Sequence, residues 1–169
     1  MAVRGMRSEI AVVEQVSVGD TLYAGAIAGS VGGVLFMIFA MGMAVLNGMD
    51  ILSPLRLIGA TFIGAGALEG GAGVILYGAL LHTATAAAWG ILFTALLPRH
   101  APMSAALIAG LVYGLLVMLV MLYLVLPIAN PVMREAVDGT TAFSIEHLIY
   151  GGALALVPAL RRRYATGTG

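Results

Sequence analysis

The charged residues of this chain lie almost entirely between four long apolar runs. Residues 21–49, 72–97, 103–129 and 143–160 contain no Lys, Arg, Asp or Glu apart from Glu146. A helix needs about 20 mainly apolar residues to cross a bilayer. Because backbone amides in hydrocarbon must be hydrogen-bonded within their own segment, each run is predicted to be a helix. We therefore expect an all-α polytopic membrane protein with four transmembrane helices in an antiparallel bundle.

The composition supports this class and argues against several functions. Of the 169 residues, 61% are hydrophobic and 9% are charged, whereas soluble domains are about 25% charged. The formal net charge is zero, which argues against a nucleic-acid surface. The absence of cysteine excludes a disulfide, a thiolate metal site and a cysteine nucleophile.

Catalytic motifs are also missing from the sequence. It contains no serine nucleophile elbow, no zinc-binding helix motif and no paired carboxylates. We therefore predict no catalytic residue and no metal site. The chain is expected not to be an enzyme, except as a subunit of a larger membrane enzyme complex.

The arginines indicate how the bundle is oriented. We expect a tail at 1–20, a single membrane domain at 21–160 and a basic tail at 161–169. Six arginines would lie on the side of the two tails, and two would lie on the other side (Arg4, Arg7, Arg99, Arg161, Arg162 and Arg163 against Arg56 and Arg134). The positive-inside rule then places both termini in the cytoplasm of a bacterium, with the protein in its inner membrane.

The segment 51–69, between the first and second spans, is apolar but interrupted. It contains Pro54, Arg56 and several glycines, and Ser53-Pro54 is typical of a helix start. We expect a short interfacial helix here. The alternative is a re-entrant hairpin, which would need protein around its unpaired backbone.

Small residues recur at helical spacing within the spans. Gly25, Gly29 and Gly33 lie four apart in the first span, and Gly110 and Gly114 do so in the third. Such stripes let helices approach closely in a membrane. They predict helix packing inside the bundle, or alternatively a homo-oligomer or docking on other membrane subunits.

His82 is predicted to lie near the middle of the second span, about 15 Å along the helix from residue 72. An ionisable group at that depth is a candidate functional site, and Thr85 and Trp89 follow it on the same helix face. The ring could bind haem iron or another metal, relay a proton, or only hydrogen-bond a neighbouring helix through a carbonyl or hydroxyl group. The sequence does not identify a cofactor, and haem is the candidate that this histidine suggests.

A second candidate site lies at the outer mouth. It combines Glu69, before the second span, with Glu146 and His147 in the first turns of the fourth. If these converged, they would form an external proton or cation site. The alternative is an interfacial cap and a solvated loop carboxylate. His147 is expected about two turns from the depth of His82, too far for both to hold one small ion.

Several features of the first half of the chain occur together: glycines at Gly25, Gly29 and Gly33, a linker that starts at Pro54, and the pairs Gly78-x-x-x-His82 and Trp89-Gly90. In this combination the chain resembles small bacterial four-helix membrane proteins of the YagU-like group. The resemblance covers roughly residues 20–97. It implies a four-helix fold and no particular activity or binding residue.

Three functions are consistent with these patterns. The first is a non-catalytic accessory or assembly subunit of a larger membrane complex. The second is a small transporter or proton or cation conduit centred on His82. The third is a haem-binding membrane anchor.

Overall fold

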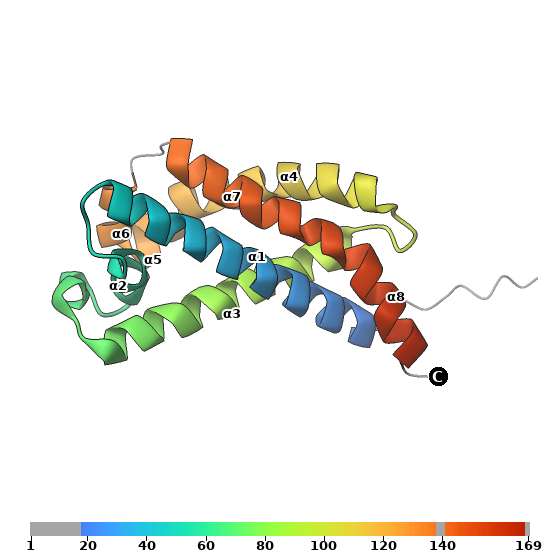
Figure 1. Cartoon of the computed structure of the whole chain (residues 1–169), viewed down its shortest axis with the longest axis horizontal. Helices are drawn as coiled ribbons and strands as arrows, with labels where there is room; N and C mark the ends of the chain where they lie inside the picture. Colours follow the sequence, from blue (N-terminus) through green and yellow to red (C-terminus); the bar gives the residue numbers. More distant parts are fainter. Residues whose placement is uncertain (1–17, 138–140, 168–169) are drawn as a thin grey trace, which may run out of the picture.

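The computed structural model describes residues 18–137 and 141–167, and every regular element within them is helical (Figure 1). Four helical stretches are long and apolar enough to cross a membrane. They are α1 (Val18–Leu46), α3 (Ala72–Leu96), the run of α4 (Met103–Val120), η2 (Met121–Val125) and α5 (Leu126–Ala129), and the run of α7 (Thr141–Ala153), η3 (Leu154–Leu156) and α8 (Val157–Gly167). The predicted four-helix fold class is confirmed.

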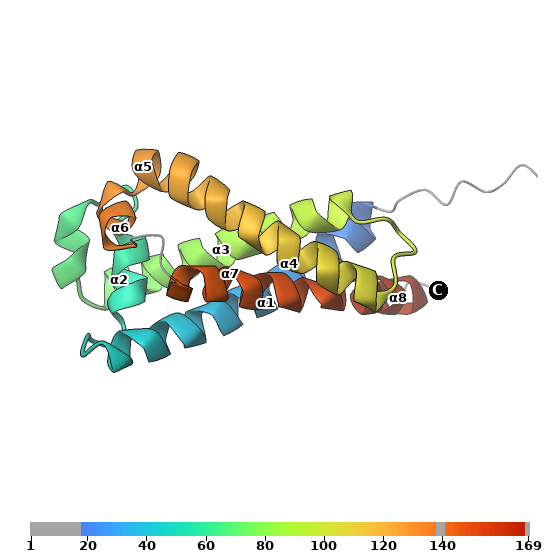
Figure 2. The same ribbon diagram turned by 90° about the horizontal axis from the view of Figure 1, so that it is seen from above.

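Short helices close one end of the bundle. After α1 come α2 (Ser53–Gly59) and the 3₁₀ helix η1 (Ala65–Glu69), and α6 (Pro131–Ala136) follows the third span. The predicted short helix between the first two spans is confirmed. We call this end of the bundle the α2 end, and the opposite end, which holds the 97–102 turn and α8, the turn end (Figures 1 and 2).

Glycines bring α1 and α3 into backbone contact. A Cβ atom added at Gly25 would lie 2.5 Å from the Cα of Ile91, and one added at Gly29 would overlap the carbonyl oxygen of Ala86. Small residues allow this approach, which gives two membrane helices close van der Waals contact. The first glycine stripe is therefore covered by α3.

The same arrangement joins α4 to α7. Added Cβ atoms at Gly110 and Gly114 would overlap the carbonyl oxygens of Gly151 and His147. The two pairs meet where Gly32 of α1 packs on Tyr150 of α7. A Cβ atom added at Gly32 would lie 2.9 Å from a carbon atom of the Tyr150 ring. The bundle is thus two tight helix pairs, and α3 and α4 diverge from their shared turn toward the α2 end (Figure 2).

Polar contacts hold the turn end together. Asp20 at the start of α1 forms a 3.1 Å ion pair with Arg99 in the turn. Arg161 is buried, and its guanidinium donates to the carbonyl oxygens of Thr94, Leu97 and Pro98. These carbonyls lie at the end of α3, where a helix leaves its last acceptors unpaired.

Two helices extend across the predicted domain boundaries. The basic tail predicted at 161–169 is helical as far as Gly167, and Arg161 within it donates to the carbonyl oxygens of Thr94 and Leu97. The first helix begins at Val18, inside the expected tail, with Asp20 buried in its ion pair. The remainder of that tail, residues 1–17, lies outside the described residues.

At the α2 end, Asn130 connects three elements. Its side-chain nitrogen donates to the carbonyl of Leu57 and the hydroxyl of Thr61, both at 2.8 Å. Its side-chain oxygen accepts from the backbone nitrogen of Met133 and caps α6. Because this buried residue ties α5 and α6 to α2, the end of the third span stays away from α3.

Candidate functional site

The divergence of α3 from α4 leaves a cavity of about 310 Å³. Its walls come from α3, the third span, α7, and Phe36 of α1, with α2 and the following turn at one side. Most of the lining side chains are apolar. Cavities of 300–1,000 Å³ with a few placed polar groups are typical of small-molecule sites.

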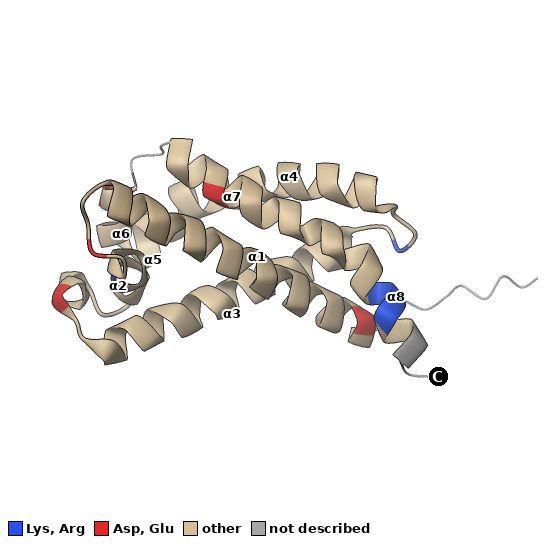
Figure 3. Cartoon of the chain, in the orientation of Figure 1, with Lys and Arg blue, Asp and Glu red and all other residues tan. Residues whose placement is uncertain are grey.

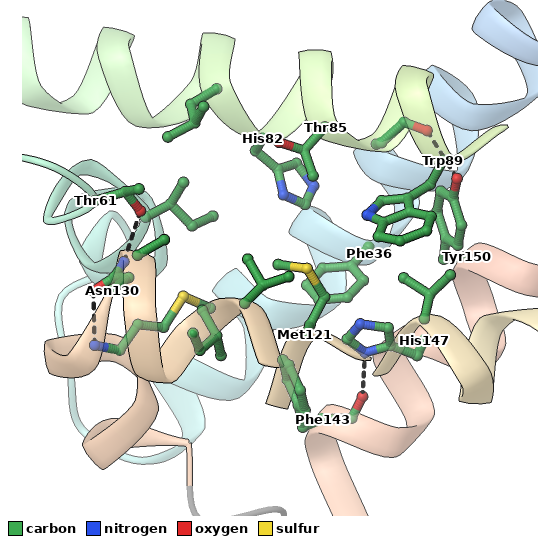
Figure 4. Close-up of a pocket in the computed structure, with 18 of the residues that line it drawn as sticks. Phe36, Thr61, His82, Thr85, Trp89, Met121, Asn130, Phe143, His147 and Tyr150 are labelled. Carbon is green, nitrogen blue, oxygen red and sulfur yellow. Dashed lines mark hydrogen bonds between the residues drawn. The ribbon is translucent and has the colours of Figure 1, made fainter. Parts of the chain in front are cut away.

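His82 and His147 both line this cavity, one from each helix pair (Figure 4). Phe36 packs against both rings, with centroid distances of 5.3 Å to His82 and 5.1 Å to His147. The expected difference in depth therefore does not separate the two imidazoles into different sites. The helices cross at an angle, and a single aromatic ring bridges the remaining gap.

Each imidazole makes one hydrogen bond to a backbone carbonyl. His82 Nε2 lies 2.9 Å from the oxygen of Gly33, and His147 Nδ1 lies 2.8 Å from that of Phe143. A carbonyl oxygen only accepts, so these two nitrogens must carry the protons. In the neutral rings, Nδ1 of His82 and Nε2 of His147 then remain as acceptors.

Further polar groups surround the histidines. Thr85 and Trp89 line the cavity as expected from their shared face with His82, and the Trp89 indole nitrogen points into it (Figure 4). Tyr150 lines it too, but its hydroxyl donates to the Ala86 carbonyl at 2.8 Å. The predicted intramembrane group of His82, Thr85 and Trp89 thus lies in one cavity.

Two irregular backbone segments line the cavity, one in the third span and one after α2. Met121 begins the π-helical turn η2 and Val125 ends it, and both line the cavity. Such turns within α-helices frequently occur at functional sites. At the rim, Phe62 is 82% exposed and has a φ of 67°, a strained value for a bulky residue.

A second cavity of about 330 Å³ lies at the α2 end, between the end of α1, α2, α6 and the start of α7. Glu146 lines it with 8% of its surface exposed. The two cavities share four lining residues, Phe36, Ile58, Met133 and Phe143. They are therefore neighbours, separated by these side chains.

The predicted outer-mouth group is spread over three places. Glu146 lines the second cavity and His147 the first, because consecutive helical residues point in different directions. Glu69 is exposed on η1 and lines neither cavity. Arg56, at the same end of the bundle, forms a 2.9 Å ion pair with Asp50.

The first cavity offers two imidazole acceptors, but it does not fit haem. Haem carries two propionates, and buried charges need partners. The described lining contains no Arg or Lys. Within the part of the chain that the structure describes, no group of three or more His, Cys, Asp or Glu side chains could hold a metal ion.

Three contributors were not identified from the sequence: Phe36, Asn130 and Tyr150. Phe36 lies in an apolar run like its neighbours, and nothing in its spacing relates it to two histidines on other helices. Tyr150 lies close to the start of the fourth predicted span and Asn130 just after the third, and neither position indicates a contact with another helix. Their positions depend on which helices pair, which single-helix periodicity does not give.

Comparison with known proteins finds no counterpart: no family model matches the chain, and no curated protein or solved structure is significantly similar to it. The YagU-like resemblance stays a prediction. The function must accordingly be argued from the cavities themselves.

Proposed function

We propose that this chain is a non-catalytic membrane protein that binds a small, largely apolar molecule carrying a hydrogen-bond donor in the cavity between α3 and α4. One observation carries the proposal. His82 and His147 each use one ring nitrogen on a backbone carbonyl while lining the same apolar cavity. Their other nitrogens can accept from a ligand, and an apolar ligand body would fill the rest.

The chemistry of the cavity selects against other ligands. A hydrophilic molecule would lose its hydration without enough partners, because few polar groups line the wall. A ligand without a donor would leave the two imidazole acceptors unpaired, a loss that buried polar sites penalise strongly. A small phenol or alcohol-like compound has the required combination.

Phenol and toluene provide a matched pair of probes, since they differ mainly by the hydroxyl donor. Trp89 is the single tryptophan and lines the cavity, so its fluorescence reports occupancy. We expect phenol to change this fluorescence in the purified protein at lower concentration than toluene does. In His147→Phe, the affinity for phenol should fall at least about tenfold, while that for toluene stays within about twofold.

His100→Phe serves as the control, because His100 is exposed in the turn and does not line the cavity. It should bind phenol like the original chain. Equal affinities for phenol and toluene, or a His147→Phe variant that keeps its phenol affinity while folded, would overturn the proposal.

A second candidate function is the predicted small transporter, or a conduit for protons or cations. The adjoining positions of the two cavities favour it. The shared wall of Phe36 and Phe143 separates the Glu146 side from the two histidines. Movement of these rings would join the cavities into one path. Flux into liposomes that is lost in both His82→Ala and Glu146→Gln supports the conduit, and flux that survives both changes rejects it.

The predicted role as an accessory or assembly subunit has weaker support. The small-residue stripes that suggested it are buried against α3 and α7 within the chain. Their packing leaves no open glycine groove on α1 or α4 for another subunit. Gentle purification with identification of copurifying proteins tests this role separately.

We place the protein in a bacterial inner membrane with both termini in the cytoplasm. Among the described residues, Arg161–Arg163 belong to α8 and Arg99 to the turn, both at the turn end, where Figure 3 shows blue segments. At the α2 end the described arginines are only Arg56 of α2 and Arg134 of α6. The positive-inside rule then assigns the turn end to the cytoplasm.

A further inference from the structure

The second cavity contains a carboxyl group without a partner. Only 8% of the surface of Glu146 is exposed. Its side chain makes no hydrogen bond or ion pair in the part of the chain that the structure describes. Placing an ionised carboxylate in such surroundings is costly unless an opposite charge accompanies it. An isolated carboxyl group there is neutralised either by a proton or by pairing with a bound cation, so Glu146 can serve as the counter-charge for a cation in this cavity.

Two other polar side chains in this cavity keep oxygen lone pairs that can interact with a positively charged ligand. Asn47 uses its side-chain nitrogen on the Met43 carbonyl at 2.7 Å, so its amide oxygen remains an acceptor. Ser53 donates its hydroxyl proton to the Asp50 carbonyl at 2.6 Å and likewise keeps its lone pairs. Among the described residues that line the cavity, Glu146 is the only one with a formally charged side chain.

The remaining wall is apolar, aromatic and rich in methionine. Phe36 and Phe143 line it, and four methionines, Met37, Met43, Met49 and Met133, do so as well. Aromatic rings attract organic cations. Methionine side chains adapt to irregular ligands. At about 330 Å³ the cavity is of small-molecule size and much larger than a bare metal ion needs.

The cavity is also accessible from the α2 end. Asn47 and Met49 belong to its lining and are exposed, so the rim reaches the surface there. Glu146 is the sixth residue of α7, about 8 Å along the helix from its start. A ligand could therefore reach the carboxylate from the membrane boundary without crossing the bundle.

We infer that this cavity is a second, separate binding site, one for a lipophilic organic cation such as a quaternary ammonium or protonated amine, with Glu146 as the counter-charge. The cation pairs with the carboxylate, and its apolar groups contact the methionines and the two phenylalanines. This site does not depend on the phenol site proposed for the first cavity.

Phenyltrimethylammonium and tert-butylbenzene test the inference, because they have nearly the same shape and differ in charge. Their binding to the full chain in lipid nanodiscs is measured by ligand-observed NMR titration. We expect the cation to bind and the neutral compound to bind at least about tenfold more weakly. Glu146→Gln should weaken cation binding by at least about tenfold, since a buried charge would lose its partner.

Glu69→Gln is the matched control, because it removes a carboxylate from the same end of the bundle outside both cavities. It should keep the affinity for phenyltrimethylammonium within about twofold, as expected for an exposed charge. Equal binding of the two probes, or equal losses in the two glutamine variants, would overturn the inference.

Ala136→Phe keeps the test decisive if Glu146→Gln does not fold. Ala136 is exposed on α6 and lines the cavity, so a larger side chain there fills space without removing the carboxyl group. Loss of cation binding in this folded variant supports the site, and full retention rejects it. His82→Phe should leave cation binding unchanged, which separates this result from the fate of the first cavity.

Discussion

Tyr150 is a point of contact between three of the four spans. It belongs to α7, its ring packs on Gly32 of α1, and its hydroxyl donates to Ala86 of α3 at 2.8 Å. The side chain also lines the first cavity. One residue therefore joins the two helix pairs and forms part of the site between them.

Tyr150→Phe should remove this hydrogen bond while leaving the ring in place. We expect the free energy of unfolding to fall by about 1 kcal/mol, as for other buried hydrogen bonds, including those inside membranes. Reversible unfolding in mixed micelles measures the change. Tyr123→Phe is the control, since Tyr123 is 67% exposed, and an equal loss there would contradict the assignment.

Asp50 gives a pH dependence outside the membrane-spanning segments. The Leu52 backbone N–H and then the Arg56 side chain stabilise its carboxylate and lower its pKa below the ordinary 3.8. A group with a lowered folded-state pKa stabilises the fold above its unfolded pKa, and loses this contribution as the pH falls through the folded value.

The original chain should therefore be more stable than Asp50→Asn from about pH 5 upward, and the difference should shrink in more acidic buffer. Unfolding of both proteins across this range measures the effect. Comparing the two variants cancels the titration of other groups that they share. A difference that stays constant down to the lowest pH would show that Asp50 does not contribute through its charge.

At the level of helices, the glycines of α1 differ in their surroundings. Gly29 faces the backbone of α3, where an added Cβ would overlap Ala86, whereas an added Cβ at Gly42 has no atom within 4 Å. We expect Gly29→Ala to lower the free energy of unfolding by about 1–3 kcal/mol through overpacking. Gly42→Ala should change it by less than about 1 kcal/mol.

Both variants are compared in one unfolding assay, with helix content followed by circular dichroism. Because the two substitutions are chemically identical and lie in the same helix, only the neighbouring helix distinguishes them. Similar stabilities for the two variants would mean that α1 and α3 do not approach as closely as described.

The number and type of the spans followed from sequence because they depend on one-dimensional quantities. Run length, the placement of charge and the break near Pro54 each relate to a single segment. The pairing of α1 with α3 and α4 with α7 is a relation between segments, and every span offered small residues. Since pairing decides that Phe36 packs between His82 and His147, the shared cavity could not be deduced.

The candidate site residues show the same difference between properties of one segment and relations between segments. Helical periodicity within one span placed His82, Thr85 and Trp89 on one helix face, and all three line the first cavity. Glu69, Glu146 and His147 were grouped by their common end of the bundle, which says nothing about side-chain direction. Adjacent positions in α7 differ by about 100°, so Glu146 and His147 enter different cavities.

In the whole molecule, the two helix pairs are held together by polar contacts at the turn end. The α2 end is less closely packed. Arg161 and the Asp20–Arg99 ion pair fix the helices at one end. At the other end α2 and α6 separate α3 from the third span; the second cavity lies there, and the first extends from there toward the middle of the spans. Ligand access is therefore expected from the α2 end or laterally, between α3 and the third span.

The orientation of this asymmetric molecule can be tested directly because the chain contains no cysteine. Single cysteines are introduced by Asp50→Cys and Glu135→Cys at the α2 end, and by His100→Cys and Arg162→Cys at the turn end. All four positions are exposed.

With the arginine-rich turn end in the cytoplasm, a membrane-impermeant maleimide should label only Asp50→Cys and Glu135→Cys in intact bacterial spheroplasts. The other two should react only after permeabilisation. Labelling of His100→Cys in intact cells would reverse the orientation and place the mouth of the Glu146 cavity on the cytoplasmic side, where only intracellular cations could reach it.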